Sequence, residues 1–538
     1  MTQTNVQPET QPGEFQPNEF QRRSAELNDL LCVINVLTWD ARTQMPGGGS
    51  GSRARQLATL STLARERLLD PAFEAAADGV ADDGEQTDQD TRAAQQALEA
   101  ISAMQRVPEA LTRELALLKS EAQDAWAAAK QNNDFAAFEP ALTRMVALTR
   151  QLAGALGYTG SESGGHPYDA LLNTYEPGLT VRTLLPLFER LRAHHVPLLR
   201  RVQAQPAPRS DFLTRFYPAA AQKTFSLAAA ERFGYDTGRG RLDQSAHPFE
   251  ISFTREDVRI TTRFQEHFLP GALFGTLHET GHALYEQGVN PELSRTVLTS
   301  DLLGLYAVGG ASYGTHESQS RLWENRIGRS AAYWKLHYPE LQSTFSDGLA
   351  DVTLEEFLRA VNRVTPSLIR VEADELTYDL HIMLRVDLEM RLIAGELEVK
   401  DLPAAWNARI REDLGLEVPD DAHGVLQDIH WSSGMFGSFP TYTIGNVMAS
   451  QFYQAAGRAI PELEAQLERG EYAPLREWLT ANIYTYGRTY TPHELLVRTT
   501  GEGLNPQPYL DYLTGKYSGL YSLETPEQLA ITEHKETV

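Results

Sequence analysis

Apolar residues recur at three- and four-residue spacing along most of the chain, with polar residues between them. This spacing gives a helix one apolar face, so it predicts helices nearly throughout. The clearest segments are 92–104, 138–156, 354–361, 376–392 and 461–467. Clusters of Pro and Gly separate the helical segments, at 46–49, 160–167, 206–208 and 234–240. The expected fold class is therefore mainly α.

Two short runs interrupt the helical pattern. Residues 249–253 and 258–264 are rich in β-branched and aromatic residues and flank a polar turn. They predict a small antiparallel hairpin, directly before a helix that carries the most informative motif of the chain.

Length and composition indicate one large domain. A chain of 538 residues could form two or three domains, but no low-complexity linker divides it, so we expect a single domain over 21–525. Residues 1–20 are rich in Gln, Pro, Glu and Asn and predict a disordered tail, and 526–538 predict a polar C-terminal tail.

The start of the chain has neither the basic residues nor the apolar run of a secretory signal, and no segment is apolar enough to cross a membrane. The single cysteine, Cys32, excludes an intramolecular disulfide. We therefore expect a cytoplasmic protein. The formal charge of −24 argues against nucleic acid and anionic membranes as partners, because both require clustered positive charge.

Residues His278, Glu279 and His282 form a His-Glu-x-x-His motif. On a helix the two imidazoles lie about 40° apart and about 6 Å along the axis, close enough to bind one metal ion. Glu279 projects beside the metal, where it can take a proton from metal-bound water and deliver it to a leaving amine. The motif is typical of a metalloprotease, although a His-x-x-x-His pair is also common on helix surfaces.

The third metal ligand lies elsewhere in the chain. An extended metzincin motif would require Gly and His where the chain has Tyr285 and Gly288. Glu286 is roughly 12 Å from His278 along the helix, too far to share an ion, and we expect it to be solvated or to support the ligands.

Glu317 follows the Gly-rich stretch 308–314 and opens a second amphipathic helix, so it can supply the missing carboxylate. His316 and Glu324 compete for this role, and all three residues also fit ordinary charges on a helix surface.

Further segments in a fixed order resemble the carboxypeptidase Taq family of metal-dependent carboxypeptidases. The resemblance covers nearly the whole chain and is carried by 247–249, 257–261, 278–282, 316–319, 369–374 and 424–431, with further matches at 39–40, 45–46 and 509–513. It supports Glu317 as the third ligand, with His278 and His282. Two departures are an apparently longer segment at 298–306 and Ser438, where the family commonly has an aromatic residue.

The resemblance implies a saddle-like helical subunit with a deep substrate groove, a homodimer, and broad specificity with poor cleavage next to proline. We expect Zn²⁺ at the site, although Co²⁺ fits the same ligands. The expected reaction releases single amino acids from peptides with a free C-terminus, with Glu279 as general base.

Three further residues are candidates for substrate contacts. The resemblance points to Arg370 as the contact of the terminal carboxylate, which a guanidinium binds through two parallel hydrogen bonds, although nearby acids would also suit Arg370 to a plain ion pair. His430 or Tyr442 can stabilise the oxyanion, although both also fit a core position. Asp374 or Asp428 is expected to orient a metal-binding imidazole.

Other roles stay open at this point. The same ligands and base would serve an oligoendopeptidase or a dipeptidyl carboxypeptidase, and a catalytically silent peptide-binding scaffold could retain the fold. The edge of the predicted hairpin can pair with a bound peptide, or the hairpin can be a purely structural ribbon.

Overall fold

The computed structural model describes residues 17–84, 86–158 and 165–523. Most of these residues are helical, and the five strongest sequence-predicted helices are confirmed. They correspond to α4 (Asp88–Arg106), α6 (Phe135–Leu156), α14 (Leu354–Val361), α15 (Glu375–Ala394) and α18 (Leu463–Glu468). The secretory-signal argument and the predicted C-terminal tail rest largely on residues outside the described ranges.

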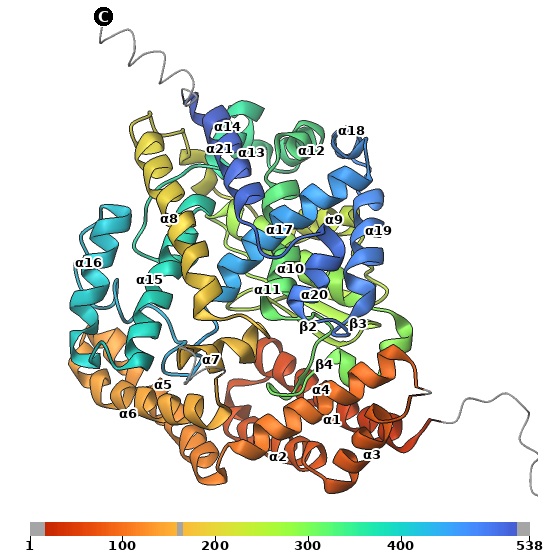
Figure 1. Ribbon diagram of the computed structural model, residues 1–538. Coiled ribbons are helices and arrows are strands. Elements are labelled where there is room, and N and C mark those ends of the chain that lie inside the picture. Colours follow the sequence, from red (N-terminus) through yellow and green to blue (C-terminus); the bar gives the residue numbers. More distant parts are fainter. Residues whose placement is uncertain (1–16, 85, 159–164, 524–538) are drawn as a thin grey trace, which may run out of the picture.

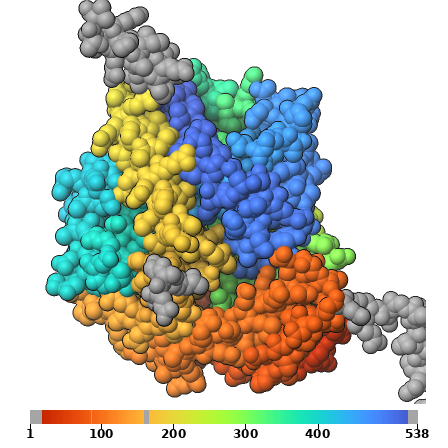
Figure 2. Space-filling view, viewed as in Figure 1, coloured from red at the N-terminus to blue at the C-terminus, as the bar shows by residue number. Residues whose placement is uncertain are grey.

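The N-terminal helices pack into a separate apolar cluster at the base of the molecule in Figure 1. They are α1 (Glu19–Thr43), α2 (Ser50–Leu68), α3 (Pro71–Ala81) and α4. Asn18 caps α1 through a capping box with Gln21, so the first helix begins inside the segment expected to be a tail. Figure 2 shows these helices, red to orange, along the lower edge, with the C-terminal helices in blue above them.

The remaining helices build the main core, which extends beside and above this base. Those before the sheet are α5 (Glu109–Asn132), α6, α7 (Tyr168–Tyr175), α8 (Val181–Gln203) and α9 (Ala219–Phe233). Those after it are α10 (Leu269–Gly288), α11 (Tyr313–Arg321), α12 (Ala331–Thr344), α13 (Ser346–Leu349), α14, α15, α16 (Leu402–Leu414), α17 (Pro440–Ala459), α18, α19 (Ala473–Asn482), α20 (Pro492–Thr500) and α21 (Gln507–Tyr521). Among the described residues, no helix is long and apolar enough to cross a membrane.

A three-stranded sheet precedes α10 and packs against it. The antiparallel hairpin predicted from the sequence is confirmed as β2 (Phe249–Thr254) and β3 (Asp257–Thr262). A further strand, β1 (Gly240–Gln244), pairs parallel with β3, so the sheet is mixed and has the order β1-β3-β2. β1 was not predicted because its sequence, Gly-Arg-Leu-Asp-Gln, has little β-branched or aromatic character.

Helices α10 and α11 pass very close to each other in the core. A Cβ atom at position 281 would lie 2.6 Å from Ser320 Cα, so only glycine allows the two backbones to pass at this distance. α11 lies between α10 and α17 and is capped at its start by Ser312, whose side chain accepts from the Thr315 amide. The glycine in the motif of α10 therefore determines how near α11 comes.

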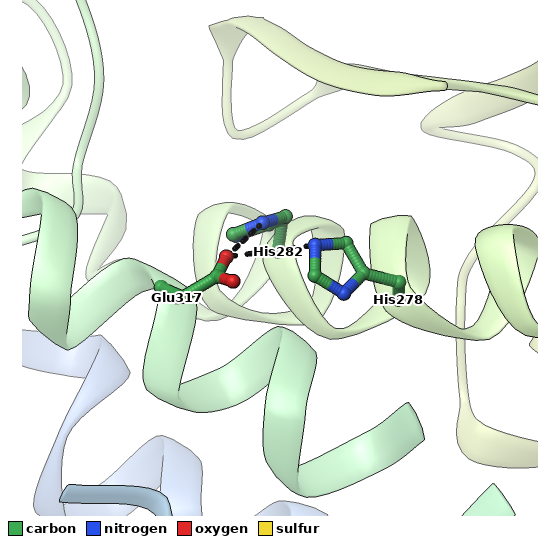
Figure 3. A group of neighbouring side chains, drawn as sticks. All are labelled: His278, His282 and Glu317. Carbon is green, nitrogen blue, oxygen red and sulfur yellow. Dashed lines mark ion pairs between the residues drawn. The ribbon is translucent and has the colours of Figure 1, made fainter. Parts of the chain in front are cut away.

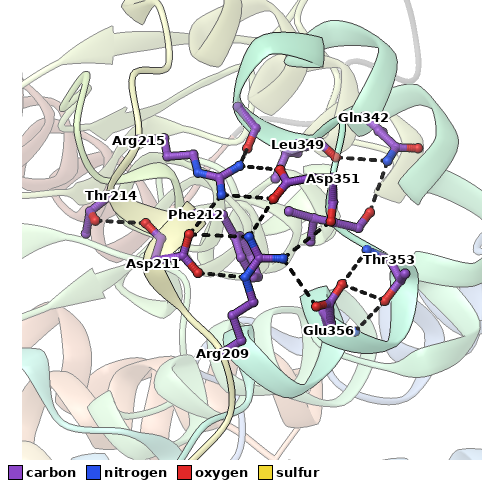
Figure 4. A network of polar contacts seen from close by, with 12 residues as sticks. Arg209, Asp211, Phe212, Thr214, Arg215, Gln342, Leu349, Asp351, Thr353 and Glu356 are labelled. Carbon is purple, nitrogen blue, oxygen red and sulfur yellow. Dashed lines mark hydrogen bonds and ion pairs between the residues drawn. The ribbon is translucent and has the colours of Figure 1, made fainter.

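A network of ion pairs on the surface joins the loop before α9 to α13 and α14 (Figure 4). Asp351 accepts hydrogen bonds from Arg215, at 2.5 Å, and from Arg209, at 2.6 Å. Arg209 also contacts Glu356 at 3.2 Å, and both arginines bind Asp211. The hydrogen bonds from Arg215 and Arg209 hold the pKa of Asp351 well below its usual value.

We predict that Asp351→Asn lowers the thermal unfolding midpoint at pH 7, because two guanidinium groups lose their shared carboxylate. A carboxyl whose pKa is depressed by folding stabilises the protein fully above its unfolded pKa, about 3.9, and loses this effect as the pH falls. The difference between variant and parent should therefore shrink toward pH 2 and also at high salt. Calorimetry at several pH values measures it, with Asp347→Asn on α13 as the control. A difference that stays constant with pH would contradict the network's electrostatic role.

Candidate active site

The structure brings His278 and His282 of α10 together with Glu317 of α11 (Figure 3). One ligand atom from each residue lies within 4.8 Å of the others. The distance to Glu317 Oε2 is 3.5 Å from His278 Nε2 and 3.3 Å from His282 Nε2. Three residues far apart in the sequence thus direct their ligand atoms toward one point.

This geometry fits a small divalent metal. Ligand atoms bound tetrahedrally to zinc at 2.0–2.2 Å lie about 3.3 Å from one another, close to the two nitrogen–oxygen distances in the structure. Two imidazoles and one carboxylate are also the donor set of a hydrolytic zinc site with an open fourth position. The residues present therefore fit a small divalent metal by donor type and by these two distances.

His278 is oriented by Glu324, not by either of the acids expected from the sequence. Glu324 Oε2 lies 3.0 Å from His278 Nδ1, and its other oxygen accepts a hydrogen bond from Arg329 at 2.9 Å. Glu324 belongs to η5 (Leu322–Gly328), a π-helical segment that continues α11. Such a contact leaves Nε2 free for the metal.

The prediction that Asp374 or Asp428 orients a metal-binding imidazole is therefore wrong. Asp374 caps α15 by accepting from the amides of Leu376 and Thr377. Asp428 binds Arg370 and Arg385. Both carboxylates are engaged by these partners, and Glu324 has the orienting role that was expected of them.

Glu286 and His316 form a buried pair beside the metal ligands. Glu286 accepts from the amides of Gly309 and Gly310 and lies 3.0 Å from His316 Nε2. The His316 ring in turn stacks on His282, with 4.4 Å between the centroids. His316 is thus engaged by Glu286 and supports His282 by stacking, and Glu286 supports the ligands from a buried position and is not solvated.

Glu317 is held as a carboxylate. Arg321 Nε donates to its Oε1 at 2.7 Å, and Ser320 Oγ donates to Oε2 at 2.9 Å. Burial alone would favour the protonated form, but Arg321 and the neighbouring imidazoles outweigh burial and hold the pKa of Glu317 well below its usual value. The ligand oxygen is therefore ionised and ready for a cation.

Glu279 lines a cavity together with His278, His282 and Glu317, and its pKa is shifted in the opposite direction from that of Glu317. Burial raises the pKa of Glu279 to about 7, although positive charge on His278 opposes the shift. A cation at the three ligands would lower this pKa again by direct attraction. A carboxyl group whose pKa is raised by burial and lowered by a nearby cation suits general acid–base chemistry near neutral pH.

The metal ligands open into a cavity of about 330 Å³. Ser438, Thr441 and Tyr442, at the start of α17, line it near Glu317, together with Met435. It is also lined by Pro248, Phe249, Glu250, Tyr306, Val308, Gly310, Ser312, Tyr313, His316 and Arg488. Ser438, which departs from the family pattern, is thus part of the cavity wall.

Of the expected substrate-binding residues, Tyr442 lines the cavity, whereas Arg370 and His430 lie outside its lining residues. Arg370 is buried and donates to Asp428 Oδ1 at 2.9 Å and to the Tyr378 hydroxyl at 3.0 Å. Its guanidinium also lies 5.4 Å from the centroid of the Tyr442 ring. Burial lowers the pKa of His430 to about 4, so its imidazole is neutral at neutral pH.

The segment 298–306, noted as an apparent extension, contributes to the cavity wall. It contains β4 (Ser300–Asp301), which pairs with β5 (Tyr306–Ala307), and Tyr306 lines the metal cavity. Asn28 of α1 donates to Ser300 Oγ at 2.9 Å, and Leu298 and Leu302 pack in the N-terminal cluster. The segment thus connects the N-terminal helices α1 to α4 to the site. Its length does not separate Glu317 from His278 and His282.

Sequence reasoning missed Tyr306 and Arg488 in the cavity wall and considered Glu324 only as a competing metal ligand. The spacing of Glu324 after Glu317 was a usable signal, because both lie on one continuous helical segment that faces α10. For Arg488 no local pattern distinguishes it from a surface arginine. Its position depends on contacts with residues nearly two hundred positions away, of which its hydrogen bond to Gly310 is one.

We predict that Glu324→Gln weakens Zn²⁺ binding about 10- to 100-fold, because the carboxylate that orients His278 is lost. Competition with a chromophoric chelator measures the affinity, and circular dichroism checks that the fold is retained. Glu355→Gln, an exposed position on α14, is the matched control. An affinity equal to that of the parent would show that His278 needs no such support.

Comparison with known proteins agrees with the geometry of the site. The family model for carboxypeptidase Taq (M32) metallopeptidases matches residues 19–517. Thermostable carboxypeptidase 1 of Thermus thermophilus is 43% identical over 511 residues, which cover 94% of this chain and 98% of the relative. Carboxypeptidase 1 of Bacillus subtilis is 39% identical, with 94% and 100% of the two chains covered.

A solved structure also shares the fold. The M32 carboxypeptidase from Deinococcus radiodurans R1 superposes with a TM-score of 0.89 at 41% identity, and the match covers 94% of this chain and 99% of that one. The mainly helical fold class expected from the sequence is confirmed by this similarity. The motifs, the site and these relatives together show that the chain belongs to the carboxypeptidase Taq (M32) family of metallopeptidases.

Proposed function

We propose that this protein releases single amino acids from the free C-terminus of peptides, with broad specificity and poor cleavage next to proline. The observation that carries the proposal is the group formed by His278, His282 and Glu317, with Glu279 in the same cavity of an M32 family member. A homodimer and a cytoplasmic location, which the resemblance and the sequence suggest, belong to the same proposal.

The three ligands would hold one divalent metal per subunit, Zn²⁺ by the nature of the donor set, with Co²⁺ as the alternative. When bound, such an ion supplies Lewis-acid activation of water and of the scissile carbonyl. The side chains around it provide the remaining chemistry.

Glu279 is the proposed general base. Its carboxylate lies in the cavity wall directly after His278 in the chain, where it can accept a proton from the attacking water. The same group can then deliver the proton to the departing amine, which must be protonated to leave. The raised pKa of Glu279 supports both proton transfers, because a carboxyl group with a pKa near neutral can accept the proton and release it again at neutral pH.

Tyr442 is the better placed of the two candidates for stabilising the oxyanion. Burial raises the pKa of its phenol, so the hydroxyl stays protonated and can donate. No described residue accepts a hydrogen bond from this hydroxyl, which leaves it available to substrate in the cavity that Tyr442 lines. His430 is neutral at neutral pH and lies outside the residues that line the cavity. Its buried Nδ1 has no hydrogen-bond partner among the described residues and lies 3.9 Å from Asp428 Oδ1, and its ring contacts Phe439.

Arg370 is the proposed contact of the terminal carboxylate. Asp428 accepts from Nε and Nη2, and Tyr378 accepts from Nη1, so the guanidinium plane is fixed beside Tyr442. The remaining Nη1 and Nη2 hydrogens can form two parallel bonds to a carboxylate that displaces neither partner. The start of β2, where Phe249 and Glu250 line the cavity, would pair with the peptide backbone, whereas α1 already binds the carbonyls of Ser252 and Phe253.

We predict that Glu279→Gln lowers kcat about 10²- to 10⁴-fold, because the amide cannot accept the proton. Metal content, measured by atomic emission, should stay at one ion per subunit. The control is Glu292→Gln, an exposed position in the short helix after α10. Activity of the Glu279→Gln variant equal to that of the parent would exclude Glu279 as the base.

We predict that the zinc-loaded protein shortens a peptide with a free C-terminus one residue at a time and leaves the C-terminally amidated peptide intact. Mass spectrometry of both digests measures this, with a chelator-treated sample as the control. Internal cleavage of the amidated peptide would favour an oligoendopeptidase, and release of dipeptides would favour a dipeptidyl carboxypeptidase. Binding without any cleavage would favour a silent scaffold.

A further inference from the structure

Arg488 is an arginine in the wall of the metal cavity that the proposed mechanism does not use. It also lines a second cavity, of about 570 Å³, which lies between α4, residues 300–303 and the start of α20. Its side chain is half-buried. Arg488 therefore contributes to the walls of two cavities, one of which contains the candidate metal ligands.

The backbone of Arg488 is fixed on both sides. Its amide donates to Leu298 O at 2.9 Å, and its carbonyl accepts from Gln96 Nε2 at 2.6 Å. The preceding Gly487 has a φ of 51°, and a Cβ there would lie 2.8 Å from Leu298 O, so only glycine permits this turn. The guanidinium is thus presented to the cavity from a rigid base.

Among the described residues, the Arg488 guanidinium has no acidic partner. No carboxylate oxygen of these residues forms an ion pair with its nitrogens, and its one acceptor there is Gly310 O, at 2.7 Å from Nη1. A guanidinium has five N–H donors, so most of its donors have no acceptor among these residues. The nearby carboxylates are already engaged, Glu176 by the Gly314 amide and Asp301 by the amides of Leu303 and Gly304.

Arg488 and Arg370 lie at opposite ends of α11, with the metal ligands between them. The N-terminal end of α11 follows Gly310, whose carbonyl accepts a hydrogen bond from Arg488. At the C-terminal end, Arg321 lies over the ring of Tyr378, and the Tyr378 hydroxyl accepts a hydrogen bond from Arg370. From Tyr313 to Arg321 the helix rises about 12 Å. Glu317 is at its middle, about 6 Å along the helix from either end.

We propose that Arg488 binds the carboxylate side chain of a substrate residue on the N-terminal side of the scissile bond. This inference rests on the proposed function, in which Arg370 takes the terminal carboxylate at the other end of α11. Extended peptide advances about 3.3–3.6 Å per residue, so about 6 Å corresponds to two residues. Arg488 therefore favours Asp or Glu two positions before the residue that is released, through charge-assisted hydrogen bonds.

Binding to the inactive Glu279→Gln protein, loaded with Zn²⁺, tests the inference without turnover. The probes are two N-acetylated tetrapeptides that differ only in Glu or Gln at the second residue from the N-terminus, two positions before the C-terminal residue. Calorimetry should give about 10-fold tighter binding of the Glu peptide. Adding Arg488→Gln should remove this preference, Arg488→Lys should retain part of it, and Arg498→Gln on the exposed face of α20 should leave it unchanged.

Equal affinities for the two peptides would overturn the inference, as would a preference that survives Arg488→Gln in a protein with an unchanged melting curve. A C-terminally amidated Glu peptide separates the two sources of carboxylate. If Arg488→Gln instead abolished the preference for free acid over amide, Arg488 would bind the terminal carboxylate and the side-chain assignment would be wrong. The proposed function is tested separately, by measuring release of the C-terminal residue with the protein in which Glu279 is intact.

Discussion

The close passage of α10 and α11 at Gly281 is the constraint on which the site depends. His278 and His282 lie on one helix and Glu317 on the other, so the three ligand atoms converge only because the two backbones nearly touch. Any side chain at 281 would separate the helices and move the carboxylate away from the imidazoles. A residue that takes no part in the chemistry thus decides whether the ligands can meet.

Around this crossing, buried charges are arranged in partnered chains. Glu324 connects His278 to Arg329, and Glu286 connects His316, which stacks on His282, to the amides before α11. His278 is therefore held by a hydrogen bond at Nδ1, whereas His282, whose Nδ1 has no hydrogen-bond partner among the described residues, is supported by the stacked ring of His316. Because an unpaired buried charge is costly, such chains make the orientation of the ligands part of the stability of the core.

The two arginines at the ends of α11 differ in how far their charge is neutralised. Arg370 is held by Asp428 and Tyr378, whereas Arg488 has only a backbone carbonyl as protein acceptor among the described residues. A metal site with Arg488 in the wall of its cavity, and with Arg370 outside that wall beside Tyr442, would bind a peptide in one direction. The polarity of substrate binding would then follow from the placement of charge along one short helix.

The sequence by itself determined the helical class, the β2–β3 hairpin and the two-histidine motif, because these depend on local spacing. The order of its motifs identified the family and pointed to Glu317, for which spacing alone left His316 and Glu324 as competitors. Only the tertiary structure brought Glu317 into one group with His278 and His282, replaced the expected Asp374 or Asp428 by Glu324, and placed Arg488 in the cavity wall. These outcomes depend on how closely α10 and α11 approach and on contacts between distant segments, which no local pattern of residues encodes.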